Sequence, residues 1–126
     1  MIREEAITAL RPRLDLTKAT NEVEQFQNTV LRPILKVQNE LMIELAKDYV
    51  HRTFKSFNAL KVSVQKQLIV QASKRNHKIR SMLIYTGIGL LTREELSLYL
   101  QHRAEFNKRI ISMGTERVIS QIDLLF

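Results

Sequence analysis

Apolar residues recur at helical spacing along most of the chain. Over residues 34–54 they cover a broad arc of one helix, and charged residues take the opposite side. An arc this wide predicts contact with more than one partner helix. Similar patterns predict helices over residues 60–73, 92–100 and 105–124, and no strand is readable. The sequence therefore predicts an all-α protein, a helical bundle of about five helices.

Several residues mark where these helices begin, kink or end. Pro33 lacks a backbone N–H and clashes with the preceding turn, so we expect the helix to kink or restart there. Asn58 is a candidate cap for the helix that follows it. Gly87 and Gly89 predict a helix end, because glycine readily adopts the left-handed conformation. Thr92–Glu95 has the pattern of a capping box.

Two features of the later helices concern their packing. The apolar stripe of residues 60–73 continues at Ile79, Met82 and Leu83, so this region is either one long helix or two helices with a break near residues 74–77. Gly114 lies inside the last predicted helix, at a cost of about 1 kcal/mol relative to alanine. We therefore expect a close helix crossing at Gly114.

The length of 126 residues fits a single domain. Residues 1–18 are expected to form an arm or a short helix, which Arg11-Pro12 should end because the residue before proline avoids the α region. Residues 19–126 are expected to form the helical-bundle domain. Its first helix begins near Thr20–Val23, with a hydroxyl cap.

Charge is distributed unevenly. The net charge is +7, and residues 61–91 carry six basic side chains and no acidic one. Five of these cations form a candidate polyanion patch: Lys61, Lys66, Lys74, Lys78 and Arg80. The simpler interpretation is a solvated surface that acids of neighbouring helices neutralise. No aromatic residue for base stacking lies within the basic run of residues 74–80, which argues against a specific nucleic-acid site.

A set of polar residues lies where apolar ones are expected. Buried polar groups cost several kcal/mol unless they are paired, so they need mutual partners, water or a ligand. One interpretation is a hydrogen-bond network between helices, and the other is a pocket in which two arginines face a small anion. The residues are Gln38, Asn39, Arg75, Asn76, Asn107, Arg117 and Gln121.

The sequence identifies no catalytic, cofactor-binding or metal-binding residue. The chain has no cysteine, which excludes disulfides, thiolate metal sites and thiol nucleophiles. Glu40, Glu44, Asp48 and His51 share one helix face, but lysines share it too and no facing motif completes a metal site. We therefore expect no cofactor, and an enzymatic role is less favoured than a binding role.

Five segments carry a resemblance to a known group of proteins: residues 26–28 (FQN), 31–39 (LRPILKVQN), 74–80 (KRNHKIR), 92–96 (TREEL) and 107–109 (NKR). Over about residues 24–122 the chain resembles a family of short, uncharacterised bacterial all-helical proteins. Some members carry a glyoxalase label. Glyoxalases of the usual kind hold a metal with His and Glu on strands, and this sequence has no readable strand. The resemblance therefore implies no established activity and no catalytic residue.

Three functions follow as hypotheses. The first is a non-catalytic helical interaction or regulatory module that forms a homo-oligomer or binds a protein partner, because a small domain may not cover its wide apolar arc alone. The second is a polyanion or nucleic-acid binder through residues 61–91. The third is a small-anion site between helices. No stretch approaches the roughly 20 apolar residues that span a membrane, so we expect a cytoplasmic protein without membrane contact.

Overall fold

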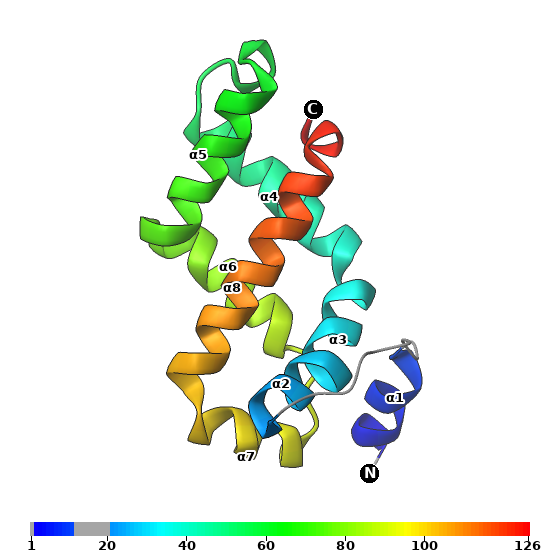
Figure 1. The fold of residues 1–126 in the computed structure, drawn as a ribbon. Coiled ribbons are helices and arrows are strands. Elements are labelled where there is room, and N and C mark those ends of the chain that lie inside the picture. Colours follow the sequence, from blue (N-terminus) through cyan, green and yellow to red (C-terminus); the bar gives the residue numbers. More distant parts are fainter. Residues whose placement is uncertain (1, 12–20) are drawn as a thin grey trace.

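The protein is all-α in the part of the chain that the structure describes. The computed structural model describes residues 2–11 and 21–126, and these ranges contain helices, turns and loops but no strand (Figure 1). The predicted fold class is confirmed for these residues.

The structure has more helices than the predicted five or so. The apolar pattern of residues 34–54 is divided at Gln38, and that of residues 60–83 is divided at Asn76. The α-helices are α1 (Ile2–Leu10), α2 (Glu22–Phe26), α3 (Arg32–Val37), α4 (Asn39–Thr53), α5 (Val62–Arg75), α6 (His77–Ile88), α7 (Arg93–Gln101) and α8 (Arg103–Ser120). A π-helical turn (Gln27–Leu31) and 3₁₀ turns (Phe57–Ala59, Ile122–Leu125) complete the order.

The helix restarts next to Pro33, as predicted. Pro33 lies in the first turn of α3. The π-helical turn immediately before it was not predicted. There the N–H of Arg32 donates to the carbonyl of Gln27, five residues earlier, and α2, the π turn and α3 follow one another without a loop.

Asn76 separates α5 from α6. Its side-chain oxygen accepts from the N–H groups of Lys78 and Ile79 at 2.9 and 3.2 Å, so Asn76 caps α6. Of the two alternatives for residues 60–83, the structure shows two helices. Arg75 and Asn76 would share one apolar stripe only in a continuous helix, and the structure does not meet that condition.

Other capping predictions had mixed outcomes. The capping box is present: the Glu95 N–H donates to the Thr92 hydroxyl, and the Glu95 carboxylate accepts from the Thr92 N–H. Asn21, not a hydroxyl, caps α2, and Thr20 lies outside the described residues. Asn58 does not cap α5, because it lies in a 3₁₀ turn and Lys61 precedes the helix.

The glycine prediction at the end of α6 was half right. The helix ends at Ile88, but Gly89 has an ordinary right-handed φ of −63°. Among the described residues, the positive φ belongs to Ser56, in the connection between α4 and α5. Gly87 serves a different purpose, which is close packing.

α6 and α8 cross at two glycines. A Cβ on Gly114 of α8 would lie 2.8 Å from Leu83 Cδ2 of α6, and a Cβ on Gly87 of α6 would lie 2.7 Å from Ile110 Cγ2 of α8. Each glycine thus accepts a large side chain of the other helix. The predicted close crossing at Gly114 is confirmed, and Gly87 is its counterpart.

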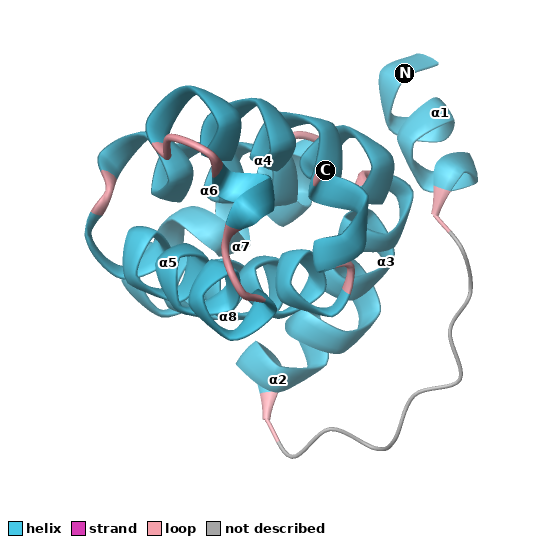
Figure 2. Ribbon diagram, turned by 90° about the horizontal axis from the view of Figure 1, so that it is seen from above, coloured by secondary structure: helices cyan, strands magenta, loops and turns pink. Residues whose placement is uncertain are grey.

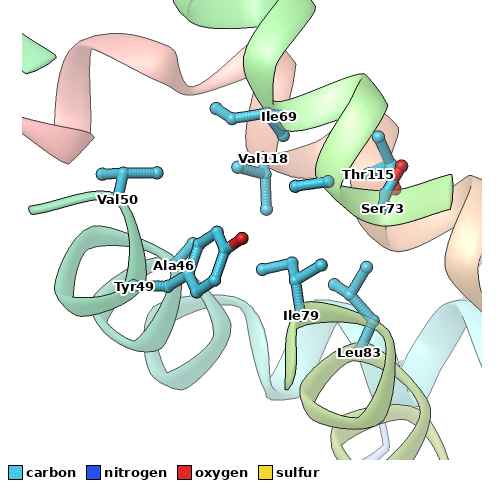
Figure 3. A pocket seen from close by; sticks show the side chains of 10 residues that line it. Ala46, Tyr49, Val50, Ile69, Ser73, Ile79, Leu83, Thr115 and Val118 are labelled. Carbon is cyan, nitrogen blue, oxygen red and sulfur yellow. The ribbon is translucent and has the colours of Figure 1, made fainter. Parts of the chain in front are cut away.

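The core lies between two pairs of helices. Seen end-on, α4 and α6 lie over α5 and α8 (Figure 2). Side chains of all four helices meet around a cavity of about 10 Å³, among them Tyr49, Ile69, Leu83 and Val118 (Figure 3). A volume this small holds at most about one water, so the cavity is a packing gap and not a ligand site.

Helix α1 lies at the edge of the molecule (Figure 2) and is held mainly by polar contacts. Arg11 forms an ion pair with Glu95 and donates to the Leu90 carbonyl at 2.8 Å. Glu4 accepts from the N–H of Arg93, and Ile7 is the buried apolar residue of α1. Of the expected arm or short helix over residues 1–18, residues 2–10 are a packed helix. Residues 12–18 lie outside the described residues.

Candidate functional site

Three of the seven predicted polar residues meet between α4 and α8. Asn39 and Gln121 form two reciprocal amide hydrogen bonds, each of 2.8 Å. Arg117 donates to the Asn39 side-chain oxygen at 3.4 Å, and Gln121 donates to the Arg117 carbonyl at 3.0 Å. The cluster is thus a hydrogen-bond network between helices, with a guanidinium at its edge.

The other four predicted residues lie apart from this cluster. Gln38 donates to the Thr86 carbonyl of α6 at 3.3 Å, and Asn76 caps α6. Asn107 accepts from the Tyr99 hydroxyl, and burial raises the pKa of Tyr99 above its usual value. Arg75 is exposed at the end of α5. The seven residues therefore do not form one site.

Arg117 has an unusual electrostatic environment. Partial burial lowers the pKa of its guanidinium, and the nearby charge of Arg32 lowers the pKa further. Among the described residues, neither arginine forms an ion pair with a carboxylate. Arg32 was not among the predicted site residues. Its neighbour Pro33 was interpreted only as a helix break, and nothing in the spacing connects Arg32 to Arg117.

The structure distributes the five predicted patch cations over several surfaces. Lys74 and Arg80 line a groove of about 730 Å³ between α5 and α8, together with Lys108 of α8. Lys78 lines a different groove, between α4 and α6. Lys61 precedes the start of α5 and Lys74 lies near its end, and Lys66 lies between them. Only Lys74 and Arg80 are brought together in one groove.

Apolar side chains remain exposed where α4 meets α6. Leu41 and Leu45 of α4 are 50% and 41% exposed, and Tyr85 of α6 is 69% exposed. Leu41 and Leu45 belong to the apolar arc that was predicted to contact more than one partner helix, and they lie at its uncovered edge. The apolar arc of residues 34–54 is wider than the part that neighbouring helices cover, so the side chains at its edge are exposed to solvent.

These residues lie on the two helices that flank one groove. At one end, Gln38 of α4's N-cap contacts Thr86 of α6; further along, Leu45 and Met82 line the same groove of about 290 Å³. Leu41 precedes Leu45 by four residues and Tyr85 follows Met82 by three, so each is one helical turn from its partner. Val37 is the last residue of α3, immediately before Gln38, and is also exposed. We call Val37, Leu41, Leu45, Met82 and Tyr85 the α4–α6 surface.

Metal-binding geometry does not occur in the described ranges. No group of three or more His, Cys, Asp or Glu side chains there could hold a metal ion. His51, which was considered with Glu40, Glu44 and Asp48, has its Nε2 atom 2.6 Å from the carbonyl oxygen of Leu125. Within residues 2–11 and 21–126, no helix combines the length and apolarity that membrane crossing requires.

Comparisons with models of protein families, with curated proteins and with solved structures found no match for this chain. The resemblance to short bacterial helical proteins therefore stays a prediction.

Proposed function

We propose that this protein is a non-catalytic helical interaction module of the cytoplasm that self-associates through the α4–α6 surface. The observation that carries the proposal is the exposure of Leu41, Leu45 and Tyr85 on the two helices that flank one groove. Contiguous exposed apolar side chains on a small domain mark a surface where another molecule binds. The absence of cysteine fits a reducing compartment.

A second copy of the chain suits this surface. The apolar row is framed by charges of both signs, since Asp48, Arg52 and Lys78 line the groove beside Leu45 and Met82. In a two-fold symmetric pair, each residue of one copy can face a different residue of the other, so Asp48 of one copy can meet Lys78 of the other. The self-complementary arrangement favours a homodimer over a strongly charged partner.

Sedimentation equilibrium at low micromolar to hundreds of micromolar protein tests the proposal. The wild type is expected to be dimeric at the upper end of this range. Leu41→Glu places a charge in the middle of the surface, and burying an unpaired carboxylate is costly, so this variant should remain monomeric.

Leu100→Glu is the matched control. Leu100 lies on α7, is 47% exposed, and is one turn from the exposed Leu96, so it represents a rival apolar row. The control should associate like the wild type. A monomeric wild type at all concentrations, or loss of association in the control but not in Leu41→Glu, would contradict the proposal.

A polyanion-binding role is the second candidate, because one observation favours it. Lys74, Arg80 and Lys108 line the α5–α8 groove, together with apolar residues such as Ile111 and with one carboxylate, that of Glu116. Two of these cations belong to the predicted patch. Cations on both walls of a groove attract an extended anionic chain.

Retention on a heparin column across a salt series tests this candidate. Lys74→Gln with Lys108→Gln should lower the salt concentration at elution more than Lys61→Gln with Lys55→Gln, which removes the same charge outside the groove. Equal losses for the two pairs would indicate only the effect of net charge and would remove the groove from consideration.

A further inference from the structure

Arg32 and Arg117 line one hollow on the surface of the molecule. Its volume is about 330 Å³, and α3 and α8 supply its walls. The lining residues are Arg32, Leu35, Met113, Glu116, Arg117 and Ser120. A volume of this size is at the lower end of the range for small-molecule sites, which is roughly 300–1,000 Å³.

Amide oxygens position both guanidinium groups. Arg32 Nε donates to the side-chain oxygen of Asn28 at 3.1 Å, and Asn28 is buried. Arg117 Nη1 donates to Asn39, which is itself held by its two bonds to Gln121. A guanidinium has five N–H groups, so these single bonds leave several donors on each arginine for another acceptor.

The positive charge in the hollow is not balanced by an ion pair. An amide oxygen accepts a hydrogen bond but carries no net charge, and neither arginine pairs with a carboxylate in the described part of the chain. Two like charges held near each other repel, so an anion between them is attracted by both. The one carboxylate that lines the hollow is Glu116, which opposes an anionic ligand.

The backbone before α3 contributes to this arrangement. Asn28 is the second residue of the π-helical turn. Arg32 is the residue that follows the turn and closes it. A π turn changes which side chains share a helix face, and such turns occur frequently at functional sites. Here the π-helical turn contains Asn28, whose side chain holds Arg32 at the hollow. Pro33 lies where the α-helix resumes.

We propose that this hollow binds the phosphate group of a small phosphorylated molecule. Two guanidinium forks match the geometry of a tetrahedral oxyanion, since each can donate two parallel hydrogen bonds to it. Leu35 and Met113 provide an apolar wall for the organic part of the ligand. The two neighbouring arginines favour a phosphate group as the ligand. The small volume of the hollow favours a soluble phosphate ester over a polymer.

Inorganic phosphate is the first probe. Thermal unfolding of the wild type is measured in phosphate and in sodium chloride of equal ionic strength. A ligand that binds the folded state and is present at about ten times its Kd should raise Tm by about 5 °C in a domain of this size. Arg32→Gln and Arg117→Gln should each lose most of this rise.

Four further variants separate binding from a structural role. Arg75→Gln removes an exposed arginine outside the hollow and should keep the full rise, as should Leu41→Glu on the α4–α6 surface. Glu116→Gln removes the opposing carboxylate and should increase the rise, whereas Glu44→Gln, the matched loss of an exposed acid, should not. A merely structural role of the arginines does not predict the gain in Glu116→Gln.

The outcomes are decisive in both directions. A rise that is lost in Arg32→Gln, kept in Arg75→Gln and increased in Glu116→Gln supports the site. No rise beyond that in sodium chloride, or equal rises in Arg32→Gln and Arg75→Gln, would overturn it. If Arg117→Gln unfolds because Asn39 loses a donor, Arg32→Gln and Glu116→Gln still decide the question.

Discussion

Leu83 and Met82 are adjacent in the sequence, but they point about 100° apart around α6 and face different helices. Leu83 is buried against Gly114 of α8, in a crossing that Gly87 and Ile110 complete. Met82 lies toward α4, where Leu41 and Leu45 stay exposed and a groove remains. The side of α6 that faces α8 is therefore buried and closely packed. The side that faces α4 borders a groove with exposed apolar side chains.

The difference shows that apolar periodicity does not identify what covers a helix face. Both sides of α6 carry apolar residues, and small residues decide which side packs closely. Glycine lets two helix backbones approach, as at Gly87 and Gly114, whereas α4 meets α6 through large side chains that cannot all be covered. The uncovered side is the one we propose for self-association.

The largest expected effect comes from truncating the side of α6 that faces α8. Leu83→Ala should lower the free energy of unfolding by about 2–5 kcal/mol, because it leaves a cavity in the core. Met82→Ala, on the side that faces α4, should cost less than half as much. Urea unfolding monitored by circular dichroism measures both, and equal losses would remove the distinction between the two sides.

A double-mutant cycle tests the glycine contact itself. Gly114→Ala places a Cβ against Leu83, and overpacking typically costs about 1–3 kcal/mol, partly offset by the higher helix propensity of alanine. Leu83→Ala removes the atom that the Cβ would meet. The double variant should therefore be more stable than the sum of the single effects by at least about 0.5 kcal/mol. Strict additivity would show that the two residues do not share the contact.

A third contact, between Arg11 and Glu95 of α7, depends on charge rather than on packing. Burial raises the pKa of Glu95, but hydrogen bonds from Arg11 and Thr92 and the charge of Arg11 outweigh it, so the pKa lies below its ordinary value of 4.5. The stabilisation is thus present above pH 4.5 and is lost as the pH falls through the lowered pKa.

The Glu95→Gln variant isolates this contact. It should cost about 1 kcal/mol near neutral pH, discounted for partial exposure, and the difference from the wild type should shrink in acid. Unfolding free energies across the acid range measure it. A difference that stays constant with pH would assign the loss to packing instead of charge.

The smallest expected effect concerns the side of α6 that faces α4. Tyr85→Ser should change the free energy of unfolding of the monomer by no more than about 0.5 kcal/mol, because the ring is 69% exposed. The same change should weaken association in sedimentation experiments. A large loss of monomer stability would show that Tyr85 packs within the molecule.

Local signals in the sequence were sufficient for much of the fold. The capping box at Thr92 and the helix boundary at Pro33 depend on neighbouring residues only. The close crossing at Gly114 was predictable because a glycine inside a helix lowers helix stability unless close packing compensates for it. The break at Asn76 stayed open, because the apolar stripe continues across it and only the cap geometry distinguishes the alternatives.

The candidate sites were less accessible from the sequence. Asn39, Arg117 and Gln121 were identified as polar residues on apolar faces, and they do meet. Arg32 was missed, and the part of the apolar arc that stays exposed was not located, because both depend on which helix lies opposite. That information is tertiary, so a single periodic pattern does not contain it.

A dilution series followed by ¹⁵N–¹H correlation spectra tests the central claim most directly. If the protein self-associates through the α4–α6 surface, resonances of Leu41, Leu45 and Tyr85 should shift with concentration, and those of Leu96 and Leu100 on α7 should stay constant. Spectra that do not change with concentration, or shifts confined to α7, would contradict the account.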